Sequence, residues 1–327
     1  MNDAFSRWIH SHRDLPMLIN QWVNIVRWEL RPRLFLRTTE FLWQEGHTAH
    51  ATAEEADAFA RTMLGVYERV SQDVMAIPVF TGEKSANEKF AGAARTYAVE
   101  AMMQDGKALQ FATSHNLGQN FAKAFTIQFE SEQRKKEYVY QTSWGLSTRT
   151  IGGLIMAHGD DAGCIFPPRI APIQVIVVPI WKSDAEKARV LAAAQRLTRE
   201  LGESGSAVQL DDRDVRPGEK FYEWERKGVP LRVEIGPRDI EKKVRTLARR
   251  DTGEKQTVPE QKVQAITKET LAAIQQNLLA RATAFRDTNT VDVSTWKEFV
   301  EHIQNGKFVR AFWDGTAATE HTIKEKT

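Results

Sequence analysis

Residues 21–43 read QWVNIVRWELRPRLFLRTTEFLW and contain two runs of alternating polar and apolar residues on either side of a proline. The first run, Gln21–Glu29, predicts a β-strand, and Phe35–Trp43 predicts a strand that returns beside it. The segment Leu30–Leu34 connects them, because its proline cannot continue a strand ladder. The N-terminal part of the chain is therefore predicted to contain an antiparallel pair of strands.

The sequence after this pair predicts one helix and three more strands. Apolar residues spaced three and four apart predict a helix from about Thr52, which Pro78 ends. The predicted strands are Lys107–Ser114, Tyr138–Trp144 and Ile151–His158. The last of these is the most apolar, and we expect it at the centre of a sheet.

A proline-rich segment, PPRIAP at residues 167–172, predicts a domain boundary, since prolines this dense exclude a helix or a central strand. Beyond it, strands and helices alternate as in an α/β domain. The predicted strands are 173–180, 207–210 and 231–235, and the predicted helices are 184–201 and 238–250. Two further helices, one from about 259 and one from Thr295 to Gly306, and a strand at 307–312 follow. We therefore expect domains at 1–168, 169–258 and 259–327.

Composition excludes several classes of protein. Lys and Arg number 45 against 43 Asp and Glu, so no strongly basic or acidic arm is expected. The single cysteine, Cys164, excludes an internal disulfide framework or a multi-cysteine metal site and favours a reducing compartment, most simply the cytoplasm. No apolar run is long enough to span a membrane, so no membrane partner is expected. The glycine-rich fingerprints of dinucleotide and P-loop sites are absent, and Glu45, His47 and His50 lack a further ligand for a metal site.

Arginines beside aromatic residues recur on the predicted strands. Arg27, Arg37 and Arg149 each lie next to or near an aromatic side chain. Guanidinium groups that converge on a sheet bind phosphate oxygens in pairs, which favours a polyphosphate ligand. Arginines on a solvated face are the alternative interpretation of the same pattern.

Three segments carry a resemblance to a known family. Residues 26–50, VRWE followed by FLRTTEFLWQEGHTAH, resemble motif 2 of class II prolyl-tRNA synthetases. TSHNLGQNF (113–121) is similarly characteristic, and SWGLSTRTIG (143–152) resembles motif 3. Residues 211–221 resemble part of the family's anticodon-binding domain. The resemblance implies an α+β class II catalytic core on an antiparallel sheet, an α/β anticodon-binding domain and a partial α+β C-terminal domain.

The resemblance also implies an activity, proline–tRNA ligation. ATP and proline would form prolyl-adenylate, and the prolyl group would then pass to the 3′ end of tRNA(Pro). Arg27 and Arg149 are the expected catalytic residues, and Mg²⁺ is expected with ATP. The residues expected to bind ATP are Arg27, Glu29, Arg37, Thr38, Gln110, Thr113, Ser147 and Arg149. Those expected to bind proline are Arg27, Trp43, Glu45, His47, Phe90, His115 and Trp144.

For the aromatic members of this set, ordinary core packing is the alternative. Glu40 and Gly145 are 105 positions apart, which is too short an interval for the editing insertion of some prolyl enzymes. Arg213, Arg216, Lys220, Phe221 and Trp224 form a basic and aromatic cluster in a stretch predicted to be rich in loops. They are candidates for contacts to unstacked anticodon bases, with an anchored surface loop as the alternative.

Compared with the family, the chain is expected to be truncated at both ends. Motif 1 and a Thr-Ser-Glu stretch that binds proline would lie before Met1. The cysteines of a zinc module would lie largely after Thr327, so no zinc is expected. A homodimer is expected of the full-length family member. Two alternatives remain: a synthetase-like tRNA-binding or regulatory protein without catalysis, and a tRNA-binding module using only residues 170–327.

Overall fold

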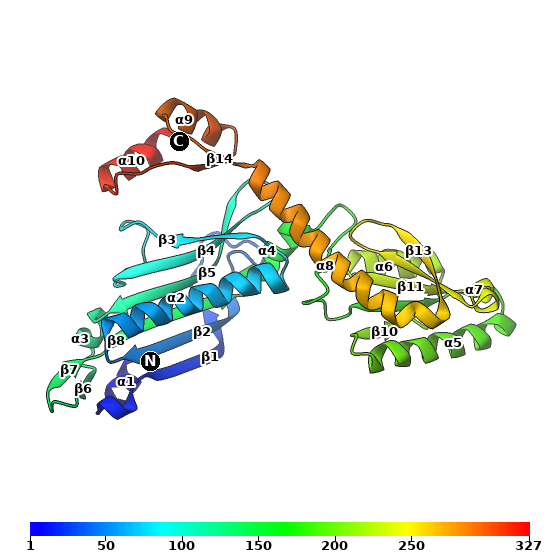
Figure 1. Cartoon of the computed structure of the whole chain (residues 1–327), viewed down its shortest axis with the longest axis horizontal. Coiled ribbons are helices and arrows are strands. Elements are labelled where there is room, and N and C mark those ends of the chain that lie inside the picture. Colours follow the sequence, from blue (N-terminus) through cyan, green and yellow to red (C-terminus); the bar gives the residue numbers. More distant parts are fainter. The chain divides into compact units, whose positions relative to one another are not determined.

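The chain packs as two compact units in the computed structural model, which describes residues 1–327 (Figure 1). The first unit contains residues 1–71, 78–153 and 285–327. The second contains residues 72–77 and 154–284. Residues 285–327 therefore pack with the N-terminal part of the chain. None of the helices is both long enough and apolar enough to cross a lipid bilayer.

A six-stranded antiparallel sheet forms the centre of the first unit, in the order β1-β2-β8-β5-β4-β3. Its strands are β1 (Met17–Val26), β2 (Glu40–His50), β3 (Val79–Glu83), β4 (Arg95–Met102), β5 (Ala108–Gly118) and β8 (Tyr140–Ser147). The antiparallel pair predicted around residues 21–43 is confirmed as β1 and β2. Strand β1 starts at Met17 instead of Gln21, and β2 starts at Glu40 instead of Phe35. Strands β3 and β4 were not predicted.

Helix α2 (Ala53–Arg69) covers one face of this sheet (Figure 1). The Tyr67 hydroxyl donates a hydrogen bond to Gln44 Oε1 of β2 at 2.7 Å. The Ser114 hydroxyl of β5 donates to the Ala60 carbonyl at 2.7 Å. Successive side chains of a strand point to opposite faces. The odd-numbered residues of β2 and β5 around these positions, Glu45 among them, therefore face away from α2.

Residues 151–158, predicted as a central strand, instead form the greater part of helix α4 (Arg149–His158). An almost uniformly apolar run shows neither the period of a strand nor that of a helix, which is why the prediction was wrong. Gly152 and Gly153 let the first turns of α4 pack closely against Leu36 and Phe111. A Cβ on Gly152 would lie 2.8 Å from Leu36 Cδ2, and one on Gly153 would lie 2.6 Å from Phe111 Cε1. Arg149, the first residue of α4, lies two residues after Ser147, the last residue of β8.

Smaller elements complete the first unit. Helices α1 (Asn2–Trp8) and α3 (Asn120–Ala124) and the pair β6 (Gln128–Glu130) and β7 (Lys136–Tyr138) enclose a small core that includes Phe5, Ile127 and Phe129. A short 3₁₀ turn spans His12–Asp14, and α2 continues as a π-helical turn at Val70–Val74. The C-terminal residues form β14 (Thr290–Asp292), α9 (Trp296–Gln304), β15 (Phe308–Arg310) and α10 (Ala317–Lys326).

The second unit is built on a five-stranded mixed sheet in the order β10-β9-β11-β12-β13. The parallel strands are β9 (Val175–Pro179), β10 (Val208–Leu210) and β11 (Leu231–Ile235), and β12 (Val244–Arg249) and β13 (Lys255–Pro259) are antiparallel. Its helices include α5 (Asp184–Glu203), α6 (Pro217–Arg226) and α7 (Pro237–Lys242). After a 3₁₀ turn at Glu260–Lys262, helix α8 (Val263–Thr288) begins. The predicted α/β pattern is confirmed.

Two predictions within this unit were wrong. Residues 238–250 are not one helix, because the chain turns at Lys243, whose φ of 52° is left-handed, and continues as β12. Arg245 of that strand is fully buried, so burial of a charged residue concealed the period of the strand. Residues 217–226, predicted to be rich in loops, form α6, which starts at Pro217, a residue favoured at the first helical position.

Candidate active site

A cavity of about 470 Å³ lies in the first unit, on the face of the sheet away from α2. Strands β2, β5 and β8 form its floor, and the connections 27–39 and 84–90 form its walls. Every residue predicted to bind ATP or proline lines this cavity, except His47. Residues that sequence reasoning missed also line it: Phe35, Leu36, Phe41, Lys84, Glu88, Thr96, Phe111, Ala112, Ser143, Gly145 and Leu146.

Three arginines border the cavity without a carboxylate partner. Arg27 lies with its guanidinium carbon 5.4 Å from the ring centre of Phe41 and 5.2 Å from that of Trp43. Arg149 donates from Nε to the Leu36 carbonyl at 3.0 Å. Burial, together with the nearby positive charges of Arg37 and Arg27, lowers the pKa of Arg149. Arginines gathered in this way, none of them in an ion pair, form an anion-binding site.

Polar side chains lie around these arginines. Ser147 accepts a hydrogen bond on Oγ from the Arg149 backbone N–H at 3.3 Å. Glu29, Thr38 and Gln110 line the same cavity, and Thr113 of β5 lies directly opposite Gly145 of β8. Position 145 has little room for a side chain, since a Cβ there would lie 3.2 Å from the Gln44 carbonyl oxygen.

Glu45 supplies a negative charge in the cavity. Its Oε2 accepts a hydrogen bond from Gln21 Nε2 at 3.0 Å and lies 3.0 Å from His47 Nε2. Burial alone would raise the pKa of Glu45, but the hydrogen bond from His47 and the charges of His47 and Arg27 hold that pKa below its usual value. Glu45 is therefore ionised at neutral pH. His47 does not line the cavity itself but contacts Glu45, and its expected part in proline binding stays a prediction.

Aromatic side chains form the apolar wall beside Glu45. The rings of Phe90 and His115 lie 4.9 Å apart, and Trp43 meets Phe41 edge to face at 5.7 Å. Burial lowers the pKa of His115 to about 4, so its imidazole is neutral at physiological pH. A small apolar space with one carboxylate suits a small hydrophobic cation.

Trp144 borders the cavity but lies in the core. Its strand neighbours place it on the α2 side of the sheet, where its ring packs 6.3 Å from that of Phe59. The same ring covers Gly46, at which a Cβ would lie 2.1 Å from Trp144 Cη2. The position of Trp144 agrees with the alternative interpretation, core packing.

In the second unit, the predicted basic and aromatic cluster surrounds Asp211. Arg213 donates to both carboxylate oxygens of Asp211, at 2.8 and 2.7 Å, and Trp224 Nε1 donates to Oδ2 at 2.8 Å. Lys220 donates to the Asp211 carbonyl at 2.9 Å. Lys220 and Trp224 are buried, so these two side chains brace α6 and do not present themselves to a base in this conformation.

A cavity of about 480 Å³ opens beside the start of α6. Arg216 and Lys220 line it together with Trp181, which sequence reasoning missed. The Lys220 ammonium lies 4.8 Å from the ring centre of Trp181. Phe221 instead stacks beneath Arg232, whose guanidinium carbon is 4.0 Å from its ring centre. Asp214 and Glu219 also line this cavity, so Trp181 beside the exposed Arg216 is the part of it that suits an unstacked base next to a phosphate.

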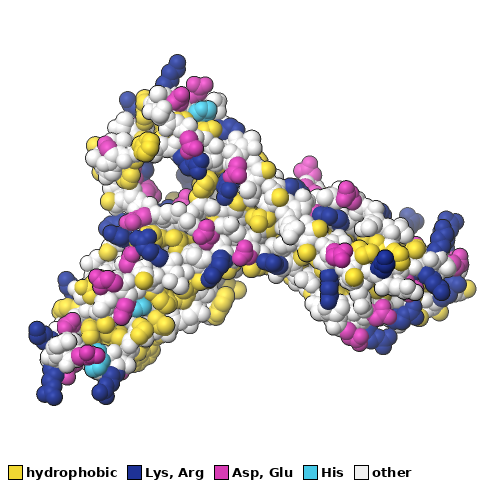
Figure 2. Space-filling model, in the orientation of Figure 1, with side chains coloured by type: hydrophobic (Ala, Val, Ile, Leu, Met, Phe, Trp, Pro, Cys, Tyr) yellow, Lys and Arg dark blue, Asp and Glu magenta, His cyan; other side chains and the backbone are white.

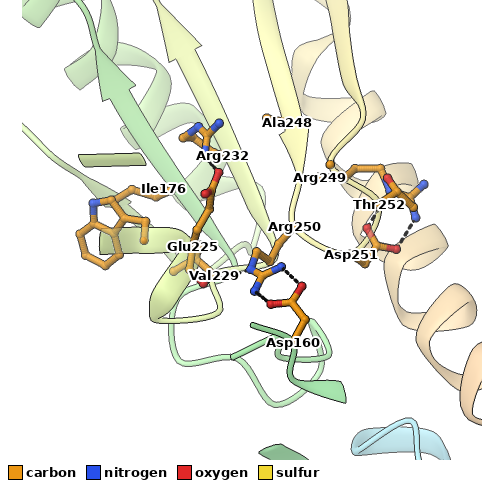
Figure 3. Close-up of a pocket in the computed structure, with 12 residues that line it drawn as sticks. Asp160, Ile176, Glu225, Val229, Arg232, Ala248, Arg249, Arg250, Asp251 and Thr252 are labelled. Atoms are coloured by element: carbon orange, nitrogen blue, oxygen red, sulfur yellow. Dashed lines mark hydrogen bonds and ion pairs between the residues drawn. The ribbon is translucent and has the colours of Figure 1, made fainter. Parts of the chain in front are cut away.

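A third cavity, of about 330 Å³, lies on the same unit and is shown in Figure 3. Arg250 pairs with both carboxylate oxygens of Asp160, at 2.8 and 2.6 Å. Arg232 pairs with Glu225, and Arg249 pairs with Asp251. Each arginine drawn in this view has a carboxylate partner. The charges therefore balance internally, in contrast to the cavity of the first unit.

Two known protein families match this chain, one over its N-terminal part and one over the part that follows. The family described as tRNA synthetase class II core domain (G, H, P, S and T) matches residues 1–158, and the anticodon binding domain family matches residues 174–270. A chloroplastic/mitochondrial proline–tRNA ligase of Arabidopsis thaliana is 52% identical over the whole chain, which covers 62% of that protein.

Two bacterial relatives give the same result. A proline–tRNA ligase of Bacteroides fragilis is 52% identical over 99% of the chain, which covers 66% of the relative, and one of Rubrobacter xylanophilus is 55% identical over 99% of the chain, which covers 68%. The chain thus spans about two-thirds of the length of these relatives. On this similarity, together with its antiparallel catalytic sheet and mixed α/β second unit, the chain belongs to the proline–tRNA ligase family of class II aminoacyl-tRNA synthetases.

Proposed function

We propose that the protein activates proline with ATP and transfers it to tRNA(Pro). One observation carries this proposal: a single cavity joins three arginines that lack acidic partners to an apolar space that holds one ionised carboxylate. The first part suits a polyphosphate, and the second suits a small apolar amine. Membership of the proline–tRNA ligase family supports the same substrates.

In the first step, a carboxylate oxygen of proline attacks the α-phosphorus of ATP. A new O–P bond forms, the bond to the β-phosphate oxygen breaks, and pyrophosphate leaves. Negative charge moves between phosphate oxygens, so the protein contributes mainly position and positive charge. Arg27, between the two parts of the cavity, would bind the α-phosphate and the proline carboxylate. Arg149, at the start of α4, would bind the distal phosphates.

The remaining cavity residues would bind and orient the substrates. Arg37, Thr38, Gln110, Thr113 and Ser147 would frame ATP. Glu29 has no ion-pair partner and offers the carboxylate oxygen that Mg²⁺ prefers, so it would hold the ion that accompanies ATP. When bound, that ion neutralises charge on the phosphate oxygens.

The proline subsite would combine charge and shape. Glu45, oriented by His47 and Gln21, would accept hydrogen bonds from the protonated secondary amine. Trp43, Phe90 and His115 would enclose the ring, and Trp144 would support the floor from behind. In the second step, a hydroxyl of the terminal tRNA ribose attacks the prolyl carbonyl, and AMP leaves.

The second unit would bind the tRNA, with Arg216 and Trp181 at the surface and Arg213, Lys220, Phe221 and Trp224 supporting them. A pair of variants tests this division between the two units. Arg149→Ala should lower proline-dependent ATP–pyrophosphate exchange by about a hundredfold or more, since a lost transition-state charge contact is worth several kcal/mol. Arg216→Ala should leave exchange unchanged and raise KM for tRNA in aminoacylation.

Arg149→Lys, which keeps the charge without the planar fork, and a thermal unfolding curve for each variant serve as controls. Tight tRNA binding without any exchange by the folded gene product would favour the non-catalytic alternative. Equal effects of the two variants on exchange would contradict the division of roles.

We also propose that the protein forms a homodimer in a reducing compartment such as the cytoplasm. Leu18, Trp22, Val26 and Leu42 form an apolar patch on one face of β1 and β2, and Trp22 is 79% exposed. Figure 2 shows hydrophobic side chains on the surface where Figure 1 has these strands. A patch of this kind on an edge strand supports pairing with a second copy.

The single cysteine, Cys164, supports the proposed reducing compartment. Cell fractionation tests this part of the proposal.

A further inference from the structure

A buried threonine connects two walls of the catalytic cavity. Thr96 lies on β4 and is 2% exposed. Its Oγ1 accepts a hydrogen bond from the Phe90 backbone N–H at 2.9 Å and lies 3.0 Å from His115 Nδ1. Phe90 belongs to the connection between β3 and β4, whereas His115 belongs to β5. One hydroxyl group thus contacts both the Phe90 backbone and the His115 ring.

The pattern of donors around Thr96 fixes where the protons lie. A backbone N–H can only donate, so the hydroxyl oxygen is the acceptor towards Phe90 and keeps its own proton available. The imidazole of His115 is neutral, because burial lowers its pKa to about 4, and it therefore carries a single N–H. If that N–H were on Nδ1 and pointed to Thr96, the buried hydroxyl proton would have no acceptor. With the Thr96 hydroxyl donating to Nδ1, both the hydroxyl proton and Nδ1 have a partner, and the single N–H of the ring lies on Nε2.

We propose that Thr96 is a positioning residue that holds His115 in the Nε2–H tautomer and ties its ring to the connection that carries Phe90. The inference rests on the proposed function for its consequence, although not for its geometry. The hydroxyl supports the 4.9 Å contact between the two rings, because it bonds to the His115 ring and to the backbone that carries Phe90. His115 then offers a hydrogen-bond donor on the ring edge away from Thr96. A donor suits an oxygen atom of the bound amino acid, while Glu45 takes the amine.

The tautomer can be measured directly on the unmodified protein. In protein labelled with ¹⁵N-histidine, the two ring nitrogens of His115 are distinguished by their chemical shifts and assigned by comparison with His115→Gln. We expect a proton on Nε2 and an unprotonated, hydrogen-bonded Nδ1. A proton on Nδ1 would overturn the proposal without any appeal to activity.

Variants test whether the hydroxyl matters for the substrate. Thr96→Val keeps the shape and removes the hydroxyl, and Thr96→Ser keeps the hydroxyl. In proline-dependent exchange we expect Thr96→Val to raise KM for proline by about three- to tenfold, the effect of one lost hydrogen bond, with KM for ATP unchanged. Thr96→Ser should restore KM. In Thr96→Val the His115 signals should change to a mixture of tautomers.

Thr142→Val is the matched control. Thr142 is also a buried strand threonine, and its hydroxyl bonds to Thr48 on the α2 side of the sheet. It should not change KM for proline or the His115 signals. The positioning role of Thr96 would be refuted if Thr142→Val raised KM for proline equally, or if Thr96→Ser did not restore KM for proline. If the unmodified protein showed no proline-dependent exchange, the proposed function would fail, while the tautomer would still be decided by the spectrum.

Discussion

At the scale of single residues, the buried carboxylate of Asp211 contributes to the stability of the second unit. Asp211 is 2% exposed and accepts hydrogen bonds from Arg213 and Trp224. Burial opposes ionisation of Asp211, but these bonds and the nearby Lys220 charge lower its pKa to about 2. The ionised form is thus much more stable in the folded protein than in the unfolded chain.

The lowered pKa of Asp211 predicts a pH dependence of stability. A carboxyl whose pKa falls on folding stabilises the protein above its unfolded pKa, and this contribution disappears as the pH falls through the folded pKa. Between about pH 4 and about pH 2 the second unit should lose about 2 kcal/mol from this group. Hydrogen exchange of the β9 and β11 amides measures the loss. The Asp211→Asn variant should be less stable at pH 7, and its stability should not show this loss between about pH 4 and about pH 2. The same loss in the variant would refute the assignment of this pH dependence to Asp211.

At the scale of elements, α10 contacts one wall of the candidate active-site cavity. Glu320 accepts hydrogen bonds from Ser85 Oγ and Asn87 Nδ2, both at 2.9 Å, and Lys324 pairs with Glu88. These partners lie in the connection that also carries Phe90. The C-terminal helix therefore restrains a segment that lines the proposed proline subsite, although it contributes no residue to the cavity.

Loss of this restraint should weaken proline binding. Glu320→Ala should raise KM for proline by roughly twofold to fivefold, the scale of a partly buried polar contact that acts indirectly, and speed proteolytic cleavage between residues 84 and 90. Glu325→Ala is the control, because Glu325 is on the same helix and pairs only with the exposed His321. Indistinguishable cleavage rates for the two variants would show that α10 does not restrain the connection.

Sequence reasoning succeeded for elements with a visible period and failed where burial hid it. The strand pair β1 and β2 and helices α2, α5 and α8 show alternation or a helical stripe. Helix α4 is apolar almost throughout, and β12 buries Arg245, so neither displays its own period. The cavity residues came from the resemblance to the family, since spacing alone left solvated arginines and core aromatics open. Thr96 could not be found, because its partners, Phe90 and His115, meet it only in the folded sheet.

At the scale of the whole molecule, the apolar patch on β1 and β2 predicts the oligomeric state. Trp22→Glu places a charge in the middle of the patch, and because Trp22 is 79% exposed the change should leave the fold of one copy intact. Sedimentation equilibrium should show a dimer for the unmodified protein and a shift of the variant towards monomer. Tyr222→Glu, at an exposed aromatic residue of the second unit, should sediment as the unmodified protein does. A monomeric unmodified protein would contradict the homodimer.

The glycine at position 46 has a consequence for how this sequence can change over time. The ring of Trp144 occupies the space in which any other residue would place its first side-chain carbon. Every replacement encoded by a mutated glycine codon adds at least that carbon, so each one displaces the floor beneath the proposed proline subsite. Gly46 contacts no substrate in the proposed function, yet the space that a side chain would need there is already filled.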